Sequence, residues 1–111
     1  MPFERIIGAA FLHPDKGVYS LPAPARHGQV SRLVDACYPE TKHANIDCEQ
    51  GFVTDRARFV SREEAWELVA LEMANTPHNP LRHYPRLENY GGPSVPKPND
   101  RGTELFSEDL W

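Results

Sequence analysis

An arginine and a histidine stand where a helix is expected to begin. Arg26 and His27 follow the proline-rich stretch Leu21–Ala25, and the apolar pattern of a helix starts directly after them. The N-terminus of a helix attracts anions through its free N–H groups and the positive end of its dipole. Arg26 and His27 are therefore predicted to grip a phosphate or a carboxylate. In the alternative interpretation the prolines only connect two elements and Arg26 is solvated.

A second basic cluster precedes the other expected helix. Arg56, Arg58 and Arg62 lie in a stretch that also holds Phe52 and Phe59. Two helix N-termini, each introduced by arginine, can converge on one anionic ligand while an aromatic ring stacks on a base. This cluster indicates a nucleotide or phosphate pocket. The structural alternatives are a solvated hairpin turn for the first two arginines and a local pair with glutamate for the third.

Familiar motifs for catalysis and for metal binding are missing from the sequence. It contains no Gly-x-Ser-x-Gly, no P-loop and no Gly-x-Gly-x-x-Gly, and its five histidines lack the spacing of metal ligands. We therefore expect no catalytic residue, no metal and no cofactor. A small phosphodiesterase or hydrolase that uses His27 with a carboxylate such as Glu64 stays open as an alternative.

Length, composition and charge limit the number of domains and the classes of partner. A chain of 111 residues with 40% hydrophobic residues suits one domain over residues 1–111. A net charge of −4 argues against binding DNA through bulk charge. No apolar run is long enough to span a membrane, and no leader is recognisable, so a cytosolic protein is expected. Its thiols Cys37 and Cys48 are expected to be free, with Cys37 packed in the core.

Hydrophobic patterns predict two hairpins. Residues 5–12 are typical of a strand that is buried on both faces, and Val18–Leu21 returns as its partner after a turn over 13–17. A second hairpin is expected over 50–60, with Thr54–Arg58 as its connection. The proline-rich stretch between the first hairpin and the first helix is expected to be extended, because a residue before proline disfavours the helical region.

Two helices are predicted after the hairpins. The first covers about 27–38 on a stripe of apolar residues (Val30, Leu33, Val34, Cys37 and Tyr38). The second covers about 61–75 and begins with a capping box of Ser61 and Glu64. Leu68 and Leu71 lie outside its apolar arc, which indicates contact with a partner subunit unless the late loop covers them.

The last third of the chain is expected to be mostly irregular. Residues 77–102 form a Pro-rich loop of a length that is usually functional or disordered, and it offers a second alternative, a module that docks a host protein. The tail Leu105–Trp111 is apolar at both ends and is expected to dock. The predicted class is α+β, with a small antiparallel sheet of two hairpins packed with two helices, a Pro-rich loop and a docked C-terminal tail.

Four blocks of the sequence resemble a family of small phage proteins: YSLPAPARH at 19–27, QGFVT at 50–54, RFVSREEA at 58–65 and LFSEDLW at 105–111. Among characterised proteins the pattern is similar to the phage anti-Thoeris sponges, which sequester cyclic ADP-ribose signals and in some cases cyclic oligonucleotides at separate sites. The resemblance implies an α+β protomer that forms a dimer or a hexamer in the host cytoplasm. It also implies anti-defence binding of a cyclic nucleotide without cleavage.

The resemblance assigns roles to five residues. Arg26 and His27 would grip phosphates or ribose, and Phe52 would line the pocket or stack in it. Arg58 and Arg62 would add positive charge from the second hairpin and the second helix.

The chain departs from the expected pattern at two places. Ala57 stands where the turn of the second hairpin is expected to carry glycine, which changes the aim of Arg58. The segment after the second helix is longer and richer in proline than expected, which leaves pocket closure and ligand choice open.

Overall fold

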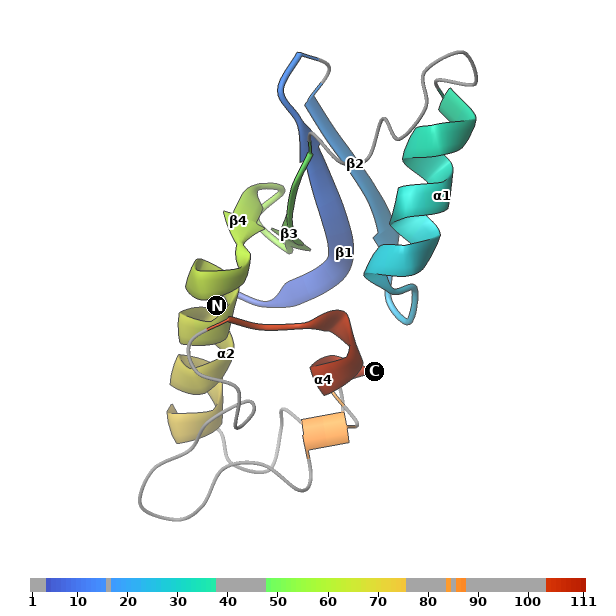
Figure 1. The fold of residues 1–111 in the computed structure, drawn as a ribbon. Helices are drawn as coiled ribbons and strands as arrows, with labels where there is room; N and C mark the ends of the chain where they lie inside the picture. Colours follow the sequence, from blue (N-terminus) through green and yellow to red (C-terminus); the bar gives the residue numbers. More distant parts are fainter. Residues whose placement is uncertain (1–3, 16, 38–47, 76–83, 85, 88–103) are drawn as a thin grey trace.

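The chain folds around a four-stranded antiparallel sheet with the strand order β2-β1-β3-β4 (Figure 1). The computed structural model describes residues 4–15, 17–37, 48–75, 84, 86–87 and 104–111. The strands are β1 (Ile6–His13), β2 (Gly17–Pro22), β3 (Glu49–Thr54) and β4 (Phe59–Ser61), and the helices are α1 (His27–Cys37), α2 (Arg62–Asn75) and α4 (Ser107–Leu110). The predicted α+β class with two hairpins and two long helices is confirmed.

Strand register places both long helices on the same face of the sheet. Leu21, Ala9, Phe52 and Val60 are successive partners across β2, β1, β3 and β4, and directly paired residues point to the same side. Ala9 packs in a cluster with Val30 of α1, whereas Phe52 and Val60 pack with α2 and the C-terminal tail. The start of α1, the start of α2 and the tail therefore meet over the middle of one face.

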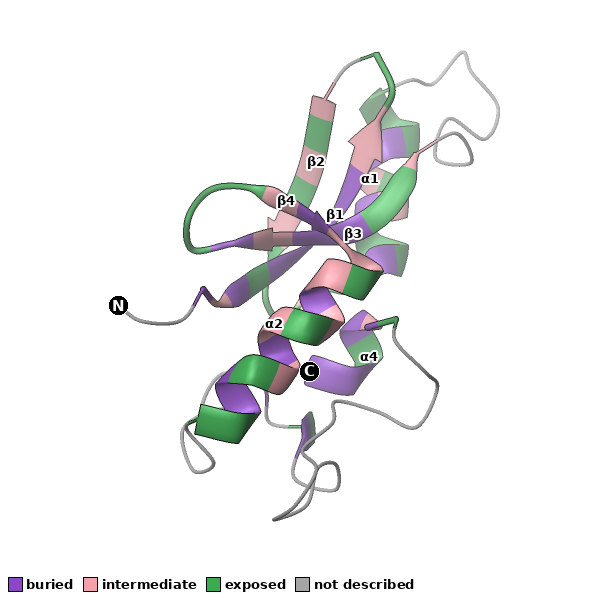
Figure 2. Cartoon of the chain, turned by 90° about the vertical axis from the view of Figure 1, so that its left-hand side faces the viewer, coloured by how far each residue is buried: buried purple, intermediate pink, exposed green. Residues whose placement is uncertain are grey.

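Most of the buried hydrophobic residues form two clusters on this face. Figure 2 marks the buried residues along the chain in purple. Full burial of a large apolar side chain such as Phe52 stabilises the fold by about 1.5–3 kcal/mol. The larger cluster lies between α2 and the tail (Ile6, Phe52, Val60, Ala65, Val69, Met73, Tyr84, Leu87, Leu105, Leu110 and Trp111). The smaller one lies under α1 (Ala9, Phe11, Val30 and Val34).

The first strand departs from its prediction at Ile7. The middle of β1 is buried on both faces as expected, but Ile7 is 45% exposed. The cause is an irregularity in the ladder, where Ile6 pairs with Thr54 and Gly8 pairs with Val53, so that Ile7 has no partner across β3. An extra residue of this kind bends a strand and turns its side chain away from the regular alternation.

The two helices confirm their predicted ranges, except that Tyr38 lies outside the described residues. The prediction that Cys37 packs in the core is wrong, because this side chain is exposed at the last turn of α1. Ser61 caps α2 as expected, and its hydroxyl accepts the Glu64 N–H at 3.1 Å. On α2, Leu68 packs against the larger cluster, while Leu71 is 51% exposed.

The turn of the second hairpin has a residue in an unusual conformation. Thr54 N–H donates to the Arg58 carbonyl at 3.0 Å, and Ala57 N–H donates to the Thr54 carbonyl at 3.0 Å. Ala57 has a φ of 58°, which is the left-handed region. A three-residue loop with a left-handed third residue is a common hairpin connection, and glycine normally fills that position. The sequence pattern led us to expect glycine at position 57, and the left-handed backbone found there is the conformation that favours glycine.

The proline-rich elbow between β2 and α1 is a turn rather than the predicted extended segment. Ala25 N–H donates to the Pro22 carbonyl at 3.1 Å, and the Ala23–Pro24 peptide bond is cis. The elbow reverses the chain at the end of β2, which lets α1 return over the sheet. It also presents the carbonyl of Ala25 to the tail, where the Trp111 indole N–H donates to it at 2.7 Å.

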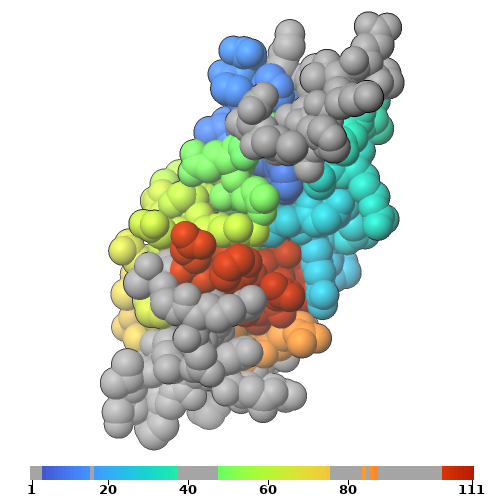
Figure 3. All heavy atoms as spheres, in the orientation of Figure 1, coloured from blue at the N-terminus to red at the C-terminus, as the bar shows by residue number. Residues whose placement is uncertain are grey.

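The tail docks as predicted and crosses from α2 to the start of α1 (Figure 3, red). Leu105 N–H donates to the Arg62 carbonyl at 3.0 Å, and Leu105 and Leu110 have no exposed surface. The predicted Pro-rich loop at 77–102 lies outside the described residues except for residues 84 and 86–87. Of these, Tyr84 is fully buried, and its hydroxyl accepts the Ile6 N–H at 2.8 Å. None of the described helices combines the length and the apolar character that a membrane crossing requires.

Candidate functional site

A pocket of about 220 Å³ lies at the N-terminus of α1, and the starts of both long helices line it. Arg26, His27 and Gly28 come from the beginning of α1, and Arg62 is the first residue of α2. The remaining wall is the tail, at residues 106–108. The structure thus brings together three of the five predicted site residues, although Arg26 and Arg62 are 36 positions apart in the sequence.

Arg26 is held at its Nε atom, which donates to the main-chain oxygen of Trp111 at 2.9 Å. Its carbonyl accepts the N–H groups of Gln29 and Val30, so Arg26 stands at the first turn of α1. Among the described residues, no hydrogen bond is found for the two terminal nitrogens of its guanidinium. These nitrogens have the planar geometry that suits a phosphate.

Arg62 lies against the ring of Phe106, with its guanidinium carbon 4.5 Å from the ring centre. One of its terminal nitrogens donates to the Gln50 side-chain oxygen at 2.5 Å. A cation over an aromatic face is attracted by the electron density of the ring. Arg62 is therefore held in a defined direction at the edge of the pocket.

His27 is buried and makes hydrogen bonds through both ring nitrogens. Nε2 lies 2.6 Å from the Gly51 carbonyl, and Nδ1 lies 3.1 Å from the Ser107 hydroxyl. A carbonyl only accepts, so Nε2 carries the proton and Nδ1 accepts from Ser107. Burial lowers the pKa of His27 to about 4, and the positive charge of Arg62 acts in the same direction. The ring is therefore neutral at neutral pH.

Comparison with known proteins places the chain in a phage family. The family model described as phage T4 y16D protein matches residues 5–111. The chain belongs to the phage T4 y16D family. The match spans the whole pocket, and the prediction of a small phage protein family is confirmed. No curated protein and no solved structure matches the chain.

In this y16D-family chain Phe52 lies below the pocket. It has no exposed surface, and its ring meets the His27 ring edge-on at 4.9 Å between centroids. Phe11 approaches His27 from the other cluster, at 6.0 Å between centroids. Phe52 therefore packs against His27, which lines the pocket, but Phe52 is not itself a lining residue.

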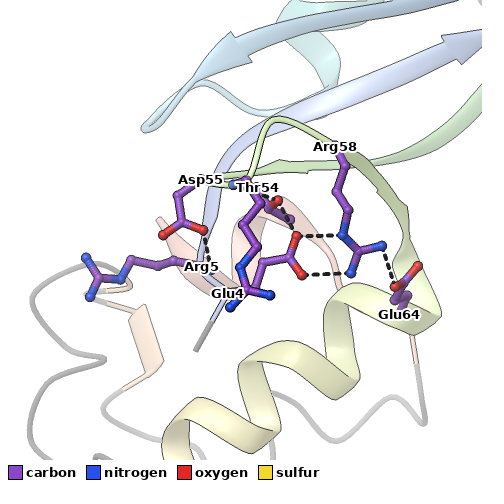
Figure 4. Close-up of polar contacts among 7 residues, drawn as sticks. Glu4, Arg5, Thr54, Asp55, Arg58 and Glu64 are labelled. Atoms are coloured by element: carbon purple, nitrogen blue, oxygen red, sulfur yellow. Dashed lines mark hydrogen bonds and ion pairs between the residues drawn. The ribbon is translucent and has the colours of Figure 1, made fainter. Parts of the chain in front are cut away.

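Arg58 lies apart from the pocket, between two carboxylates (Figure 4). Its Nε and Nη2 atoms donate to the two oxygens of Glu4 at 2.6 and 2.7 Å, and Nη1 lies 2.8 Å from Glu64. The Thr54 hydroxyl also donates to Glu4, at 2.5 Å. These bonds, first of all those from Arg58, hold the pKa of Glu4 at about 2, and the two carboxylates raise the pKa of Arg58. The ion pair with glutamate that the sequence offered as an alternative for Arg62 is found at Arg58.

A second, larger hollow of about 560 Å³ shares Arg62 with the first pocket. Its other lining residues include the carboxylates Glu49, Glu63 and Glu104 and the polar side chains of Gln50 and Ser61. Carboxylates accept hydrogen bonds and repel phosphates, so this hollow suits the hydroxyl or N–H groups of a ligand. Arg62 thus borders both hollows, one lined also by Arg26 and the other lined by several carboxylates.

The contribution of the tail to the site was missed by sequence reasoning. The sequence predicted that Leu105–Trp111 docks, but it assigned Phe106, Ser107 and Glu108 no part in a pocket. A polar pair such as Ser107 and Glu108 within an apolar docking segment is the signal that was available. Within the described part of the chain, no group of three or more His, Cys, Asp or Glu side chains is placed to hold a metal ion. His78 and His83 lie outside that part.

Proposed function

We propose that this y16D-family protein is an anti-defence sponge that binds and sequesters a cyclic nucleotide immune signal, of the cyclic ADP-ribose type, without cleaving it. One observation carries the proposal: Arg26 and Arg62, from two distant segments, line one pocket at the N-terminus of α1. Two guanidinium groups and a helix N-terminus form an attractive environment for phosphate. The resemblance of the four sequence blocks to the anti-Thoeris sponges supplies the ligand class.

The neighbouring hollow supports a nucleotide over a bare phosphate. A cyclic nucleotide carries ribose hydroxyls and base N–H groups beside its phosphates. The carboxylates of Glu49, Glu63 and Glu104 line the larger hollow and can accept from such groups. Because Arg62 borders both hollows, one ligand can contact it while occupying both compartments.

The state of His27 supports binding without cleavage. A general base works best when its pKa lies near the working pH. The pKa of His27 is about 4, and both of its ring nitrogens are hydrogen bonded within the protein. The carboxylate suggested as its catalytic partner, Glu64, lies 2.8 Å from Arg58 and does not line the pocket.

The proposal includes an oligomer, a dimer or a hexamer, that acts in the host cytoplasm. The feature that favours it is Leu71, a large apolar side chain that is 51% exposed on α2. Light scattering of the purified protein is expected to give a mass that is a multiple of 12.6 kDa. A single 12.6 kDa species at working concentration would refute the proposed oligomer.

Ligand release tests the function directly. The purified protein is mixed with cyclic ADP-ribose isomers and cyclic di- and trinucleotides, freed of unbound ligand and heated, and the released compounds are identified by mass. An intact nucleotide is the expected result. The variant Arg62→Ala is expected to release at least about tenfold less, because it loses a charge-assisted phosphate contact. Arg56→Ala, which removes an exposed arginine outside both hollows, serves as its matched control and is expected to release the wild-type amount.

A second candidate function is hydrolysis of the bound nucleotide. The observation that favours it is the hydrogen bond from the Ser107 hydroxyl to His27 Nδ1, inside the same pocket as the two arginines. A histidine that accepts the proton of a serine is the pairing found in enzymes with a serine nucleophile. Recovery of a cleaved product in the release experiment, lost in Ser107→Ala, would establish this function in place of sequestration. Recovery of no nucleotide would favour the third possibility, a module whose residues 77–102 dock a host protein.

A further inference from the structure

Both arginines of the pocket are held by the C-terminal tail. The two residues come from separate elements, since Arg26 precedes α1 and Arg62 begins α2. Arg62 lies over the ring of Phe106, and Arg26 donates to the main-chain oxygen of Trp111. The tail therefore contacts the side chain of each arginine.

The contact at Phe106 fixes the plane of Arg62. An arginine side chain on a helix surface samples many rotamers, and ordering it costs rotamer entropy. The Phe106 ring, 4.5 Å from the guanidinium carbon, restricts this freedom before a ligand arrives. A side chain ordered in advance loses less entropy on binding, so the affinity for an anion rises.

The contact at Trp111 fixes the direction of Arg26. Its Nε–H donates to the Trp111 main-chain oxygen at 2.9 Å, and the Trp111 indole returns a bond to the Ala25 carbonyl at 2.7 Å. This reciprocal pair ties the elbow to the end of the tail. The two terminal nitrogens of Arg26 lie beyond the atom that Trp111 binds, at the far end of the guanidinium.

Hydrogen bonds and burial fix the backbone of the tail around Phe106. Leu105 N–H donates to the Arg62 carbonyl, and the Asp109 carboxylate accepts the Phe106 N–H at 2.9 Å. Ser107 is joined to His27, and Leu105 and Leu110 are fully buried. Phe106 is thus flanked on both sides by fixed residues, which defines where its ring lies.

We propose that Phe106 and Trp111 are positioning residues that set the two arginines of the site, so that anion binding and docking of the tail are linked. The proposal rests on the proposed function, because it concerns the same pocket. By linkage, a ligand that binds only the site with a docked tail stabilises the docked state in return.

A double-mutant cycle tests the role of Phe106, with inorganic pyrophosphate as the probe and calorimetry as the measurement. Phe106→Leu keeps an apolar side chain but removes the ring, and it is expected to weaken pyrophosphate binding about fivefold. Phe106→Tyr keeps the ring and is expected to bind like the wild type. In an Arg62→Ala background, Phe106→Leu is expected to change the affinity no further, because its effect passes through Arg62.

Hydrogen exchange gives a second measurement. Pyrophosphate would not change exchange in the tail if Phe106 and Trp111 had only a structural role. Saturating pyrophosphate is expected to slow amide exchange in the tail at Leu105, Asp109 and Trp111 by about tenfold or more. The same concentration is expected to slow exchange in Arg62→Ala by about twofold or less, because the variant binds at least about tenfold more weakly. The variant Glu108→Gln, on the same tail and in the pocket, removes a negative charge and is expected to bind pyrophosphate more tightly.

Three outcomes would overturn the proposal. An equal loss of affinity from Phe106→Leu with and without the Arg62→Ala substitution would show that the ring acts through the fold. Unchanged tail exchange on saturation would show that docking and binding are independent. Absence of pyrophosphate binding to the wild type would remove the anion pocket itself, whereas the sponge function would still stand or fall with the release of a nucleotide.

Discussion

His27 and Ser107 are joined twice, although 80 positions separate them in the sequence. The Ser107 oxygen lies 3.2 Å from the backbone nitrogen of His27 and 3.1 Å from its Nδ1 atom. The hydroxyl therefore accepts from the backbone and donates to the ring, since the proton on Nε2 goes to Gly51. One serine thus satisfies an N–H at the first turn of α1 and the acceptor Nδ1, while the Gly51 carbonyl fixes the tautomer of the histidine.

His27 connects both hydrophobic clusters and several elements of the fold. Its ring touches Phe52 of the larger cluster and Phe11 of the smaller one. It also joins α1, β3 and α4 through hydrogen bonds. Two walls of the candidate pocket, the start of α1 and the tail, are therefore joined through a residue that was predicted to contact ligand.

The first prediction concerns pH. The folded protein keeps His27 neutral with a pKa of about 4, whereas the unfolded chain has the ordinary value of 6.5. Below pH 6.5 the unfolded state binds more protons, so stability falls as the pH drops from 6.5 to 4, by up to about 3 kcal/mol, and levels off below 4. His27→Gln, which keeps an N–H and an acceptor but does not titrate, is expected to lose this dependence. Urea unfolding of both proteins between about pH 7 and 4 measures it.

Other groups also titrate at acidic pH, and the comparison of wild type with His27→Gln cancels their contributions to stability. Glu4 has its pKa lowered to about 2, so its stabilisation is lost only between about pH 4.5 and 2. Burial raises the pKa of Glu72, which changes stability in the opposite direction. The difference between wild type and His27→Gln isolates the histidine. Parallel curves for the two proteins from pH 6.5 to 4 would contradict a neutral, buried His27.

The second prediction concerns Gly51. A Cβ at this position would clash with the Val60 carbonyl and would lie 2.5 Å from the Phe59 ring. Gly51→Ala is expected to destabilise the fold by about 3 kcal/mol or more, because backbone that pairs β3 with β4 must shift. Gly28→Ala is the matched control. Nothing lies within 4 Å of its added Cβ, and alanine favours a helix, so stability is expected to rise by up to about 1 kcal/mol.

Thermal unfolding of the two alanine variants decides this prediction. Equal midpoints for Gly51→Ala and the wild type would mean that β3 and β4 do not approach as closely as the pairing of Gly51 with Ser61 requires.

The third prediction concerns Ala57. A residue with a side chain in the left-handed region costs about 1 kcal/mol relative to glycine. Ala57 has a φ of 58° in the turn between β3 and β4, so Ala57→Gly is expected to stabilise the protein by about 1 kcal/mol. The same substitution at Ala74, which is exposed on α2, is expected to destabilise by a similar amount. Chemical denaturation of both variants measures the two signs, and a loss of stability in Ala57→Gly would contradict the turn geometry.

Local signals were sufficient to predict the elements of this fold. The alternation at β3, the stripe of Val30 and Val34 and the cap at Ser61 depend on neighbours within one element, where periodicity is informative. The exposure of Cys37 shows the limit. Its side chain is exposed at the last turn of α1, whereas Val30 and Val34 of the same stripe are buried. Which residues of a helix are covered by the rest of the fold is not encoded in the helix.

The candidate site depended on contacts that no local pattern contains. Arg58 and Glu4 are 54 positions apart, and His27 and Ser107 are 80 apart. The residue types predicted a cationic cluster, and three of the five predicted site residues meet in one pocket. Which arginine lines the pocket and which faces a carboxylate depends on the packing of the N-terminal residues and the tail, and the sequence alone does not supply it.

The last prediction distinguishes Arg58 from Arg62, which received the same role in the sequence analysis. Arg58 is engaged by Glu4 and Glu64, while Arg62 lines both hollows. Arg58→Ala is expected to lower the thermal midpoint, because the buried Glu4 carboxylate loses its bidentate partner. It is expected to leave the affinity for cyclic ADP-ribose within about twofold of the wild type. Arg62→Ala is expected to show the reverse, with binding weakened about tenfold or more and a smaller change in midpoint.

Calorimetric titration and thermal unfolding of both variants check this separation. Glu4→Gln provides the control for Arg58→Ala, because it removes the same ion pair from the other side and should lower the midpoint without touching the pocket. A loss of cyclic ADP-ribose affinity in Arg58→Ala but not in Glu4→Gln would show that Arg58 leaves its carboxylates to meet the ligand. In that case the role implied by the family resemblance would hold, and the ion pair with Glu4 would be a resting position of the site.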